Sequence, residues 1–513
     1  MRPIYSRRVR RLPYYKRTYK GGTVIMTRSK LPDYRWVQTA LAAPKRRRTK
    51  KKKMTQALTK SAAVQNPGLN LFDVPPTDYS LAESRYVPIN PFTTGIHPID
   101  FQIDPQDDFI NLAKSYFEVE LQLKLDNAGN IANDTLVTIC NNFIHSLFKQ
   151  INVRLNGTLI SPQRDNYHHK AFIDTVIHND RHDGETILKT EGWFNGLTCR
   201  DASGTALTAN QLNPAHDDFK ALSQDEQNWV KSIKPFNGGA KVVFRFKPYL
   251  EVFQLSKLLV PGVQIQIQMY LNSREIWSQK HGGGRHIRDI TADDLKITLF
   301  LNQNKVLPSV YRGLLNQFQK SSSKKAVYPT TRSEIRTFNH PNDSVYFEAN
   351  NIFHNQRPNR VIVALLDQTA FNGSETKYAF GYKTFNITSI KQLVQGEEYP
   401  YRVLELDHQS SSQDLSGYDQ FLQATECLKR KGNMVRAEDW GRNKGCTLLV
   451  FNNAPSKSLS SAVLNPPQTG EVKIVIRFGA NPGVNLTVLV YGEFENLLEI
   501  DGNRTVLYDY YRS

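Results

Sequence analysis

Hydrophobic residues alternate with polar ones along much of the chain after residue 95. Residues 117–125 read Phe-Glu-Val-Glu-Leu-Gln-Leu-Lys-Leu, so every odd position is apolar. Residues 263–271 repeat this period of two, with uncharged Gln or Tyr at the even positions. Such alternation predicts half-buried β-strands, and the Gln spacers predict an outer face that is covered or paired. The same reasoning predicts strands over 241–246, 295–301, 334–338, 344–347, 361–366, 472–478 and 484–491.

Helical periodicity is sparse by comparison. Residues 169–177 and 310–318 are the two candidate helices. Gly, Pro and Asn clusters separate the predicted strands, and Asn156-Gly157 predicts a type I′ hairpin turn because both residues tolerate positive φ. Many strands, long loops and few short helices favour an all-β fold made of sandwiches or barrels.

The length of 513 residues indicates more than one β domain. One sandwich takes roughly 100–200 residues, so the chain beyond its N-terminal region has room for two. A break near Asn302-Gln303-Asn304 divides that part almost equally. We therefore predict an arm over 1–53, a linker or N-terminal extension over 54–94, a first domain over 95–302 and a second over 303–513. The halves show no residue-level repeat.

Charge separates the N-terminal arm from everything that follows. Residues 1–53 contain 19 Lys and Arg and one acid, Asp33, whereas the whole chain has 66 basic and 48 acidic residues. The remaining 460 residues therefore hold 47 of each, and the arm carries the whole net charge of +18. Blocks of like charge repel one another and bury too little apolar surface to fold alone, so we expect the arm to be disordered.

The arm has the chemistry of a polyanion-binding segment. Basic groups neutralise phosphates and release counterions, and the interleaved Tyr14, Tyr15 and Tyr19 can stack on exposed bases. The second basic cluster also has the form of a nuclear localisation signal; a merely solubilising tail is the alternative. The predicted nucleic-acid-binding residues are Arg7, Arg8, Arg10, Arg11, Lys16, Arg17, Lys20, Lys45, Arg46, Arg47, Arg48, Lys50, Lys51, Lys52 and Lys53.

Other sequence features set the cellular context. The chain contains no run of about 18 apolar residues, so no membrane span is expected, and no apolar segment follows the basic N-terminus as in a secretory signal. Four cysteines, Cys140, Cys199, Cys427 and Cys446, are too far apart for a zinc knuckle and too few for a disulfide framework. They fit a protein that folds in a reducing compartment.

No motif predicts catalysis, a cofactor or a metal. The Gly-x-Ser-x-Gly, His-Glu-x-x-His and phosphate-loop patterns are absent from the sequence, and Gly282-Gly283-Gly284 is interpreted as a surface loop. His178 and His182 have a metal-compatible spacing on a helix, but the intervening Asn179-Asp180 favours a turn. The acids Glu493, Glu495, Glu499 and Asp501 are expected on the exposed side of the last strand. We therefore predict that the protein is not an enzyme.

Four segments resemble the double-jelly-roll, hexon-like major capsid proteins of Polinton/Maverick-type elements and their adintovirus and adomavirus relatives. They occur in the family's order, although the family's Tyr-Pro-Tyr-Arg is replaced here by Tyr167-His168-His169-Lys170. The segments are Asn142 to Gly157, Tyr167 to Ile177, Arg336 to Phe338 with Arg357 to Ser374, and Val488 to Asp501. In this comparison His145 is interpreted as a buried structural histidine.

The resemblance implies two consecutive jelly rolls in one chain, with no cofactor. It implies homotrimers that form pseudo-hexagonal capsomers, neighbouring capsomers and minor or penton capsid proteins as partners, and an icosahedral shell. It further implies location in the virion. The form of the second basic cluster predicts nuclear import receptors as partners of the arm and assembly in the host nucleus. Long loops such as 194–234 are expected to form outer towers or contacts between subunits.

The basic arm departs from the family, whose members begin near the first jelly roll. We therefore expect this chain to combine shell building with contact to genomic DNA. Two other function classes stay open at this point. One is a nucleic-acid-binding protein that derives from such a capsid gene and does not assemble, and the other is a lectin-like or carbohydrate-processing jelly roll.

Overall fold

The computed structural model describes residues 78–508, apart from 94, 162–164, 198–206, 321–323, 407–414, 428–431, 442–443 and 457–463. It also describes the backbone of three strands between residues 14 and 39. Residues 1–77 and 78–513 form two separate compact units.

The first unit contains a small antiparallel sheet with the order β1-β2-β3. Its strands are Tyr14–Tyr19, Gly22–Arg28 and Trp36–Thr39. The prediction that all of residues 1–53 are disordered is therefore wrong for the backbone of these strands. Tyr, Thr, Val and Ile favour extended backbone, and the argument from charge left this preference out. The other residues of the arm lie outside the described part of the chain.

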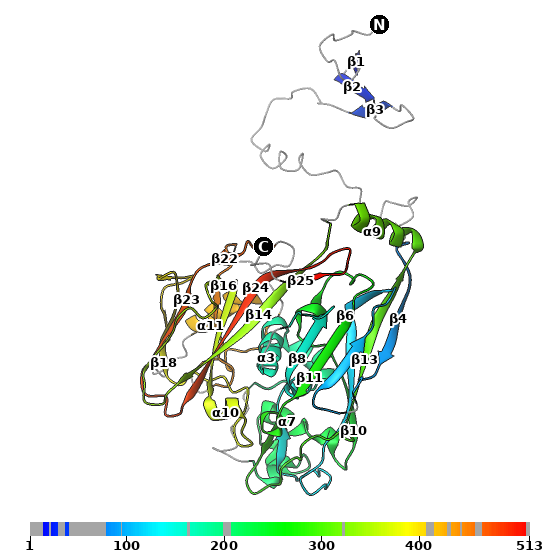
Figure 1. The fold of residues 1–513 in the computed structure, drawn as a ribbon. Coiled ribbons are helices and arrows are strands. Elements are labelled where there is room, and N and C mark those ends of the chain that lie inside the picture. The colour runs from blue at the N-terminus through cyan, green and yellow to red at the C-terminus, as the bar shows by residue number, and fades with distance from the viewer. Residues whose placement is uncertain are drawn as a thin grey trace. The chain divides into compact units, whose positions relative to one another are not determined.

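Two four-stranded antiparallel sheets form the first half of the second unit, which we call the first roll (Figure 1). Sheet 1 has the order β4-β13-β6-β10, and sheet 2 has the order β5-β11-β8-β9. Sheet 1 consists of β4 Leu81–Ile89, β6 Phe109–Gln122, β10 Lys241–Phe246 and β13 Leu295–Val306. Sheet 2 consists of β5 Ile99–Ile103, β8 Phe148–Leu155, β9 Thr158–Leu159 and β11 Ile265–Leu271.

Two five-stranded antiparallel sheets form the second roll. Sheet 3 has the order β14-β24-β17-β21, with β25 beside β24. Sheet 4 has the order β15-β23-β18-β19, with β20 beside β18. Sheet 3 consists of β14 Ala326–His340, β17 Arg360–Asp367, β21 Leu449–Asn452, β24 Leu486–Ile500 and β25 Val506–Tyr508. Sheet 4 consists of β15 Tyr346–Ala349, β18 Ile387–Val394, β19 Glu397–Glu398, β20 Leu404–Glu405 and β23 Val472–Phe478.

The two rolls have the same topology. In each roll the chain passes back and forth between the two main sheets, with one hairpin inside sheet 2 and its counterpart inside sheet 4, and the spatial order β4-β13-β6-β10 corresponds to β14-β24-β17-β21. Likewise β5-β11-β8-β9 corresponds to β15-β23-β18-β19. The duplication that length and strand count predicted is thus present as an identical wiring of strands, although no sequence repeat marks it.

The boundaries of the rolls differ from those we expected. Asn302, Gln303 and Asn304 lie inside β13 and are buried, because they continue its pairing with β4 and β6. The connection between the rolls contains α9, Pro308–Lys320. The segment expected to be a linker over 54–94 includes β4, which is an edge strand of sheet 1.

Helices are short and lie mainly between strands. The predicted helices over 169–177 and 310–318 correspond to α3 and α9. The α-helices are α2 Phe143–Ser146, α3 Tyr167–His178, α4 Arg181–Glu185, α5 Ala209–Leu212, α6 Asp217–Lys220, α7 Gln224–Lys231, α8 Arg274–Trp277, α9, α10 Gln368–Asn372 and α11 Ser416–Ala424. The 3₁₀ helices are η2 Ile187–Glu191, η3 Lys234–Phe236 and η4 Glu251–Gln254. Two further strand pairs join β7 Val137–Ile139 to β12 Ser278–Lys280 and β16 Gln356–Arg357 to β22 Gln468–Thr469.

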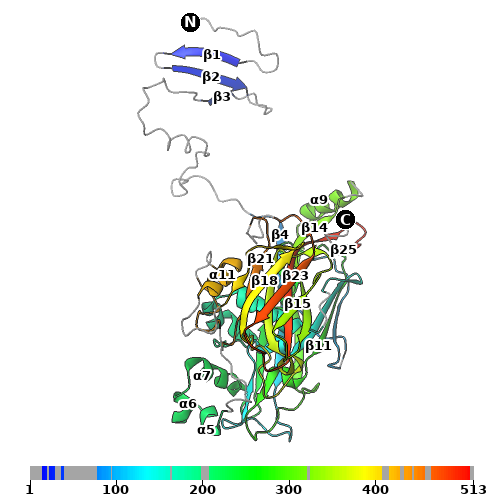
Figure 2. The same cartoon turned by 90° about the vertical axis from the view of Figure 1, so that its left-hand side faces the viewer.

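The described part of the segment over 194–234 consists of short helices joined by turns and loops. It contains α5, α6 and α7, which lie at the opposite end of the rolls from α9 (Figure 2). Ser223 caps α7 by accepting from the Glu226 backbone N–H, while the Glu226 side chain accepts from the Ser223 N–H, a capping box that satisfies two otherwise unpaired donors. Trp229 and Val230 anchor the helix in the interior.

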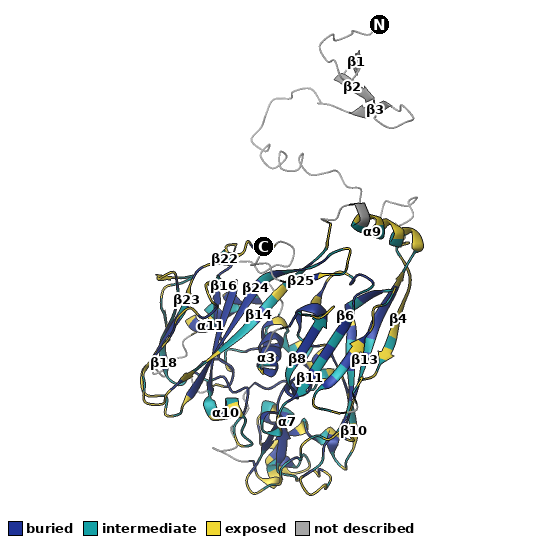
Figure 3. Cartoon of the chain, in the orientation of Figure 1, coloured by how far each residue is buried: buried dark blue, intermediate teal, exposed yellow. Residues whose placement is uncertain are grey.

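Burial follows the strand pattern, as Figure 3 shows. In β11 the apolar residues are buried and the Gln residues between them are half-buried, which agrees with a partly covered outer face. Asn156 and Gly157 both have positive φ, at 46° and 81°, so the predicted hairpin turn between β8 and β9 is confirmed. All of the predicted strands overlap observed ones, and 241–246 and 472–478 match β10 and β23 residue for residue.

Candidate functional site

Helix α3 lies between the two rolls and joins their cores (Figure 1). Every residue from Tyr167 to Ile177 is buried. Tyr167 and Ala171 belong to the hydrophobic cluster of the first roll, whereas Phe172 and Val176 belong to the cluster that fills the second. A single helix that is covered on all sides therefore forms the center of the junction between the rolls.

Aromatic side chains from the second roll pack against the first half of α3. The Phe172 and Phe380 rings stack with centroids 4.7 Å apart and an interplanar angle of 1°. The His169 ring stacks on Phe371 at 5.2 Å, and its Nδ1 lies 3.0 Å from the Tyr382 hydroxyl. These contacts cross from the first roll to the second, so they fix the position of one roll against the other.

Two neighbouring histidines of α3 are held neutral by burial. Burial lowers the pKa of His168 to about 3. Burial and then the neighbouring His168 lower the pKa of His169 well below its ordinary value. Among the described residues, neither ring nitrogen of His168 has a hydrogen-bond partner, so nothing there compensates for a positive charge.

A buried ion pair within α3 also forms a hydrogen bond with the second roll. The Lys170 ammonium lies 2.9 Å from Asp174 Oδ2, and the Tyr491 hydroxyl of β24 donates to Asp174 Oδ1 at 2.8 Å. Burial lowers the pKa of Lys170, but the neighbouring carboxylates, Asp174 first, outweigh burial and raise it overall. Both side chains are therefore hydrogen-bonded inside the junction.

A second buried ion pair lies next to it within sheet 3. Arg360 of β17 donates from Nε and Nη2 to the Glu493 carboxylate of β24 at 2.8 and 2.9 Å, the two-point geometry that strengthens such pairs. Arg360 Nη2 also lies 3.4 Å from His178 Nε2 at the end of α3. Farther along, Glu251 of η4 accepts from the Ser333 backbone N–H at 3.2 Å and from its hydroxyl at 3.1 Å.

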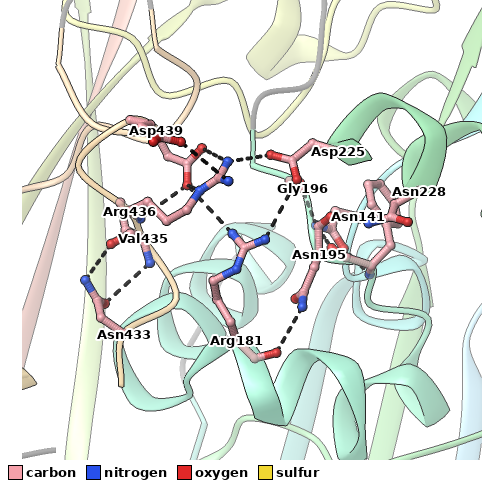
Figure 4. A network of polar contacts seen from close by, with 12 residues as sticks. Asn141, Arg181, Asn195, Gly196, Asp225, Asn228, Asn433, Val435, Arg436 and Asp439 are labelled. Carbon is pink, nitrogen blue, oxygen red and sulfur yellow. Dashed lines mark hydrogen bonds and ion pairs between the residues drawn. The ribbon is translucent and has the colours of Figure 1, made fainter. Parts of the chain in front are cut away.

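Figure 4 shows another polar network that crosses between the rolls. Arg436 of the second roll donates to Asp225 of α7 at 2.7 Å and, through Nε, to the buried Asp439 at 2.9 Å. The Arg181 guanidinium of α4 approaches Asp225 at 3.8 Å and Asp439 at 4.0 Å. The hydrogen bond to Asp439 raises the pKa of Arg436 despite partial burial. Two arginines and two aspartates thus alternate in charge across the junction.

Amide side chains hold the backbone around this network. Asn195 Nδ2 donates to the Arg181 carbonyl at 2.9 Å, and Asn228 Nδ2 donates to the Asn195 carbonyl at 2.8 Å. Asn141 Nδ2 donates to the carbonyls of Phe194 and Gly196 at 2.8 and 3.1 Å. These bonds position the α4 and α7 residues against the second roll, a structural rather than chemical task.

The structure places few of the predicted nucleic-acid-binding residues. Lys16 and Arg17 lie in β1, where the backbone alone is described. The remaining members of the predicted set lie outside the described residues, namely Arg7, Arg8, Arg10, Arg11, Lys20, Lys45, Arg46, Arg47, Arg48, Lys50, Lys51, Lys52 and Lys53.

The other histidines considered in the sequence analysis lie at structural positions. His145 is fully buried, with Nδ1 2.8 Å from the Tyr167 hydroxyl and Nε2 3.2 Å from Glu191, so the prediction of a structural histidine is confirmed. His178 ends α3, whereas His182 lies in α4. Within the described part of the chain, no group of three His, Cys, Asp or Glu residues could hold a metal ion.

The expectation that the C-terminal acids face solvent is wrong for Glu493. That residue is buried against Arg360, because β24 is covered on both faces. Glu499 does pair with Lys325 at the surface. The contacts between the rolls were not predicted from the sequence. One signal for them was present, because Arg360 directly precedes the apolar run over 361–366. A charged residue next to such a run favours a buried partner of opposite charge.

Comparisons with known proteins were made with both sequence and structure. No family model matches the sequence. An uncharacterized protein of Caenorhabditis elegans, F54H12.2, is 22% identical over 413 residues, covering 78% of this chain and 90% of that protein.

Among solved structures, a chain from the cryo-electron microscopy structure of the Sputnik virophage has a TM-score of 0.55 and 11% identity, over 88% of this chain and 93% of its own. The mavirus major capsid protein has a TM-score of 0.49 and 11% identity, over 88% of this chain and 95% of its own. The chain has the double-jelly-roll fold. The resemblance that the four sequence segments indicated is therefore confirmed at the level of the fold.

Proposed function

We propose that this chain is the major subunit of an icosahedral viral or virus-like capsid, and that it assembles as trimers. The observation that carries the proposal is the duplicated strand order of the two rolls, together with the fold shared with the Sputnik chain. Three copies of a chain with two equivalent rolls supply six similar rolls, which suits a pseudo-hexagonal capsomer. Its partners are other copies of itself and minor or penton capsid proteins.

The junction between the rolls supports a structural, non-enzymatic role. Its main charged side chains are paired with opposite charges, Lys170 with Asp174 inside α3 and Arg360 with Glu493 inside sheet 3. Paired and buried ions do not act as free acids, bases or nucleophiles.

No helix in the described residues is long and apolar enough to cross a membrane.

Purified full-length protein tests the proposal directly. We expect a mass of three chains by light scattering, and hexagonal particles or closed shells by negative-stain electron microscopy. A protein that stays monomeric over a range of concentration, salt and pH would contradict it.

We infer further that the basic residues of the arm contact the packaged DNA in the virion. The inference is supported by the confinement of the net charge of +18 to residues 1–53, since phosphate neutralisation is the main source of nonspecific affinity for nucleic acid. In this proposal the second basic cluster also engages nuclear import receptors, and assembly takes place in the host nucleus.

Deletion of residues 1–53 separates the two proposals. Trimers should persist, while DNA binding and packaging should fall. For the full chain, the logarithm of the binding constant should fall with the logarithm of salt concentration, with a slope of about −0.9 per phosphate contacted. A chain with residues 1–53 in scrambled order serves as the control, because it keeps the charge. If truncated shells pack DNA normally, the arm has another role.

A nucleic-acid-binding protein that derives from a capsid gene and does not assemble is the second candidate. The match to a protein of an animal favours considering it, because a capsid-derived gene can be retained without its shell. This candidate predicts DNA binding by monomers and no capsomers, so the same microscopy distinguishes it.

A further inference from the structure

Helix α9, in the connection between the rolls, has an apolar side that is only partly covered (Figure 3). Its apolar residues recur at helical spacing and therefore share one face. They are Val310, Tyr311, Leu314, Leu315 and Phe318. None of these residues is buried, and Leu314 is 37% exposed. Most helices in proteins are stabilised by burial of such a face, so this side of α9 is suited to contact a further apolar group.

A cavity with a volume of about 630 Å³ lies beside this face of α9. The first roll supplies the buried residues Phe109 and Val260 to its lining, and the second roll supplies Tyr328 of β14. The Tyr328 hydroxyl donates to the Leu258 carbonyl at 3.1 Å and accepts from the Val260 N–H at 3.1 Å. These bonds hold the floor of the cavity in place, and its volume lies within the range of small-molecule sites, about 300–1,000 Å³.

The lining of the cavity is positively charged. Four of the described residues that line it are basic and none is acidic; the basic ones are Lys257, Lys324, Lys325 and Arg504. Lys325 pairs with Glu499, which lies outside the lining. Lys257 Nζ donates to the neutral Val327 carbonyl at 2.7 Å. Within the described part of the chain, only one of the four positive charges is therefore matched by a carboxylate.

The positive charge gathers toward one end of α9. Near the start of the helix, Phe109 packs edge-to-face on Tyr311 with ring centroids 6.1 Å apart. The Arg504 guanidinium lies 5.3 Å from the centre of the Phe318 ring, which is about 10 Å farther along the helix. Lys324 follows the end of α9 by four residues. The cavity is thus apolar toward the start of α9 and positive toward its end.

We propose that this cavity binds a free long-chain fatty acid, with its acyl chain against α9 and its carboxylate near Arg504 and Lys324. A molecule with one anionic group and one apolar chain matches both the charge of the lining and its division into two ends. The volume suits one small ligand rather than a protein partner. A capsomer can form with or without this ligand, so the proposal goes beyond the proposed function.

Binding of defined probes to the full-length protein tests the chemistry. By titration calorimetry at pH 7.5, dodecanoate below its micelle-forming concentration should bind saturably. It should bind about tenfold more tightly than decanoate, because two further CH₂ groups are buried. Dodecanol, which has the same chain without the charge, should bind at least about tenfold more weakly than dodecanoate. An absence of saturable binding, or an affinity that does not depend on chain length, would overturn the proposal.

The positive end of the cavity is tested by removal of two charges. Lys257→Gln with Lys324→Gln should abolish most of the preference for dodecanoate over dodecanol and leave dodecanol binding unchanged. The matched control is Lys114→Gln with Lys296→Gln on sheet 1, where both lysines are exposed and lie outside the cavity. It should keep the full preference. A full preference in the cavity variant would show that these lysines do not hold the carboxylate, and would overturn the assigned site.

The apolar end is tested on α9 itself. Leu314→Asp should weaken the binding of dodecanoate and dodecanol alike by at least about tenfold, because it places a charge against the acyl chain. Asn316→Asp, on the exposed polar side of the helix and outside the lining, should bind both probes like the wild type. An unchanged circular dichroism spectrum shows that each variant folds. Equal affinities for Leu314→Asp and the wild type would overturn the assigned cavity.

Vesicles of anionic phospholipid distinguish a free fatty acid from a membrane surface. The basic arm attracts such vesicles by charge, so the measurement is the difference between the wild type and Leu314→Asp. Equal sedimentation of both proteins with vesicles is the expected result. A lower bound fraction for Leu314→Asp would assign the face of α9 to a membrane surface and overturn the proposal. Light scattering measures trimers separately, so a failure of fatty-acid binding leaves the capsid role standing.

Discussion

At the residue scale, the junction between the rolls buries charged side chains in pairs and a histidine without a partner. Lys170 lies at hydrogen-bond distance from Asp174, and Arg360 lies at hydrogen-bond distance from Glu493. His168 is buried as a neutral ring because it has no such partner among the described residues. Removing one partner of a pair, or adding a proton to the histidine, leaves an uncompensated charge in the interior.

Acid should destabilise the protein through His168. Its pKa in the folded state is about 3, below the ordinary value of 6.5, so folding favours the neutral ring. This contribution is complete above pH 6.5 and is lost, at up to about 1.4 kcal/mol per pH unit, as the pH falls toward 3. Urea unfolding at pH 7.5 and 5.5 should show a smaller loss for His168→Phe than for the wild type. The exposed His182→Asn should lose as much as the wild type; an equal loss in all three proteins would refute the assignment.

Replacing one partner of the Arg360–Glu493 pair should lower the free energy of unfolding more than replacing both partners. Arg360→Ala leaves Glu493 buried without a counter-charge, and we expect a loss of about 3–5 kcal/mol in the free energy of unfolding. The double variant Arg360→Met, Glu493→Leu should recover most of that loss, because neither charge remains. Chemical denaturation of the wild type, Arg360→Met, Glu493→Leu and the double variant measures the coupling. Additive losses would show that the two side chains act independently.

At the element scale, local pattern predicted strands well and their surroundings poorly. The alternation in β6 and β11 reports one buried face each, and both strands formed as predicted. Residues 361–366 are uniformly apolar because both faces of β17 are covered, one by the core of its own roll and the other by the first roll. The domain boundary expected near Asn302 is wrong, because Asn302 and Asn304 lie within a strand in which they are buried and hydrogen-bonded.

Strand β24 should tolerate no added side-chain volume at its centre. A Cβ on Gly492 would lie 2.6 Å from the Phe353 ring, so Gly492→Ala should cost about 1–3 kcal/mol by overpacking. Gly313 in α9 is the control, since a Cβ there meets nothing within 4 Å. Gly313→Ala should stabilise slightly, by roughly 0.5–1 kcal/mol, because Ala has the higher helix propensity. Thermal unfolding should show a lower stability for Gly492→Ala and a slightly higher stability for Gly313→Ala. An unchanged stability of Gly492→Ala would mean that Phe353 moves aside freely.

At the scale of the whole molecule, the two rolls share core residues, because the hydrophobic cluster of each roll includes side chains from the other half of the sequence. The cluster that fills the second roll also contains Phe172 and Trp193 from the first-roll half of the sequence. The network of Arg181, Asp225, Arg436 and Asp439 adds a second bridge. A chain held together in this way presents two equivalent rolls in one fixed arrangement.

The shared core predicts that the rolls unfold together. Calorimetry of residues 78–513 should show one transition. Phe172→Ala removes the ring that stacks on Phe380, so we expect a loss of about 3–5 kcal/mol and a separation of the transition into two. Phe101→Ala, buried within the first roll alone, should lower stability without splitting the transition. Two transitions already present in the wild type would contradict the shared core.

The sequence by itself determined the strand content, the all-β class, the concentration of charge in residues 1–53 and, through four ordered segments, the double jelly roll. These features depend on local alternation and on motifs that lie along the chain, so they can be read without knowing what packs where. Only the tertiary structure decided that β4 belongs to the first roll, that β13 runs through Asn302, and that α3 joins the rolls through a buried hydrogen bond and stacked rings. Those outcomes depend on contacts between residues far apart in sequence, such as Asp174 with Tyr491, and no local pattern encodes which distant side chain will supply the matching charge or hydroxyl.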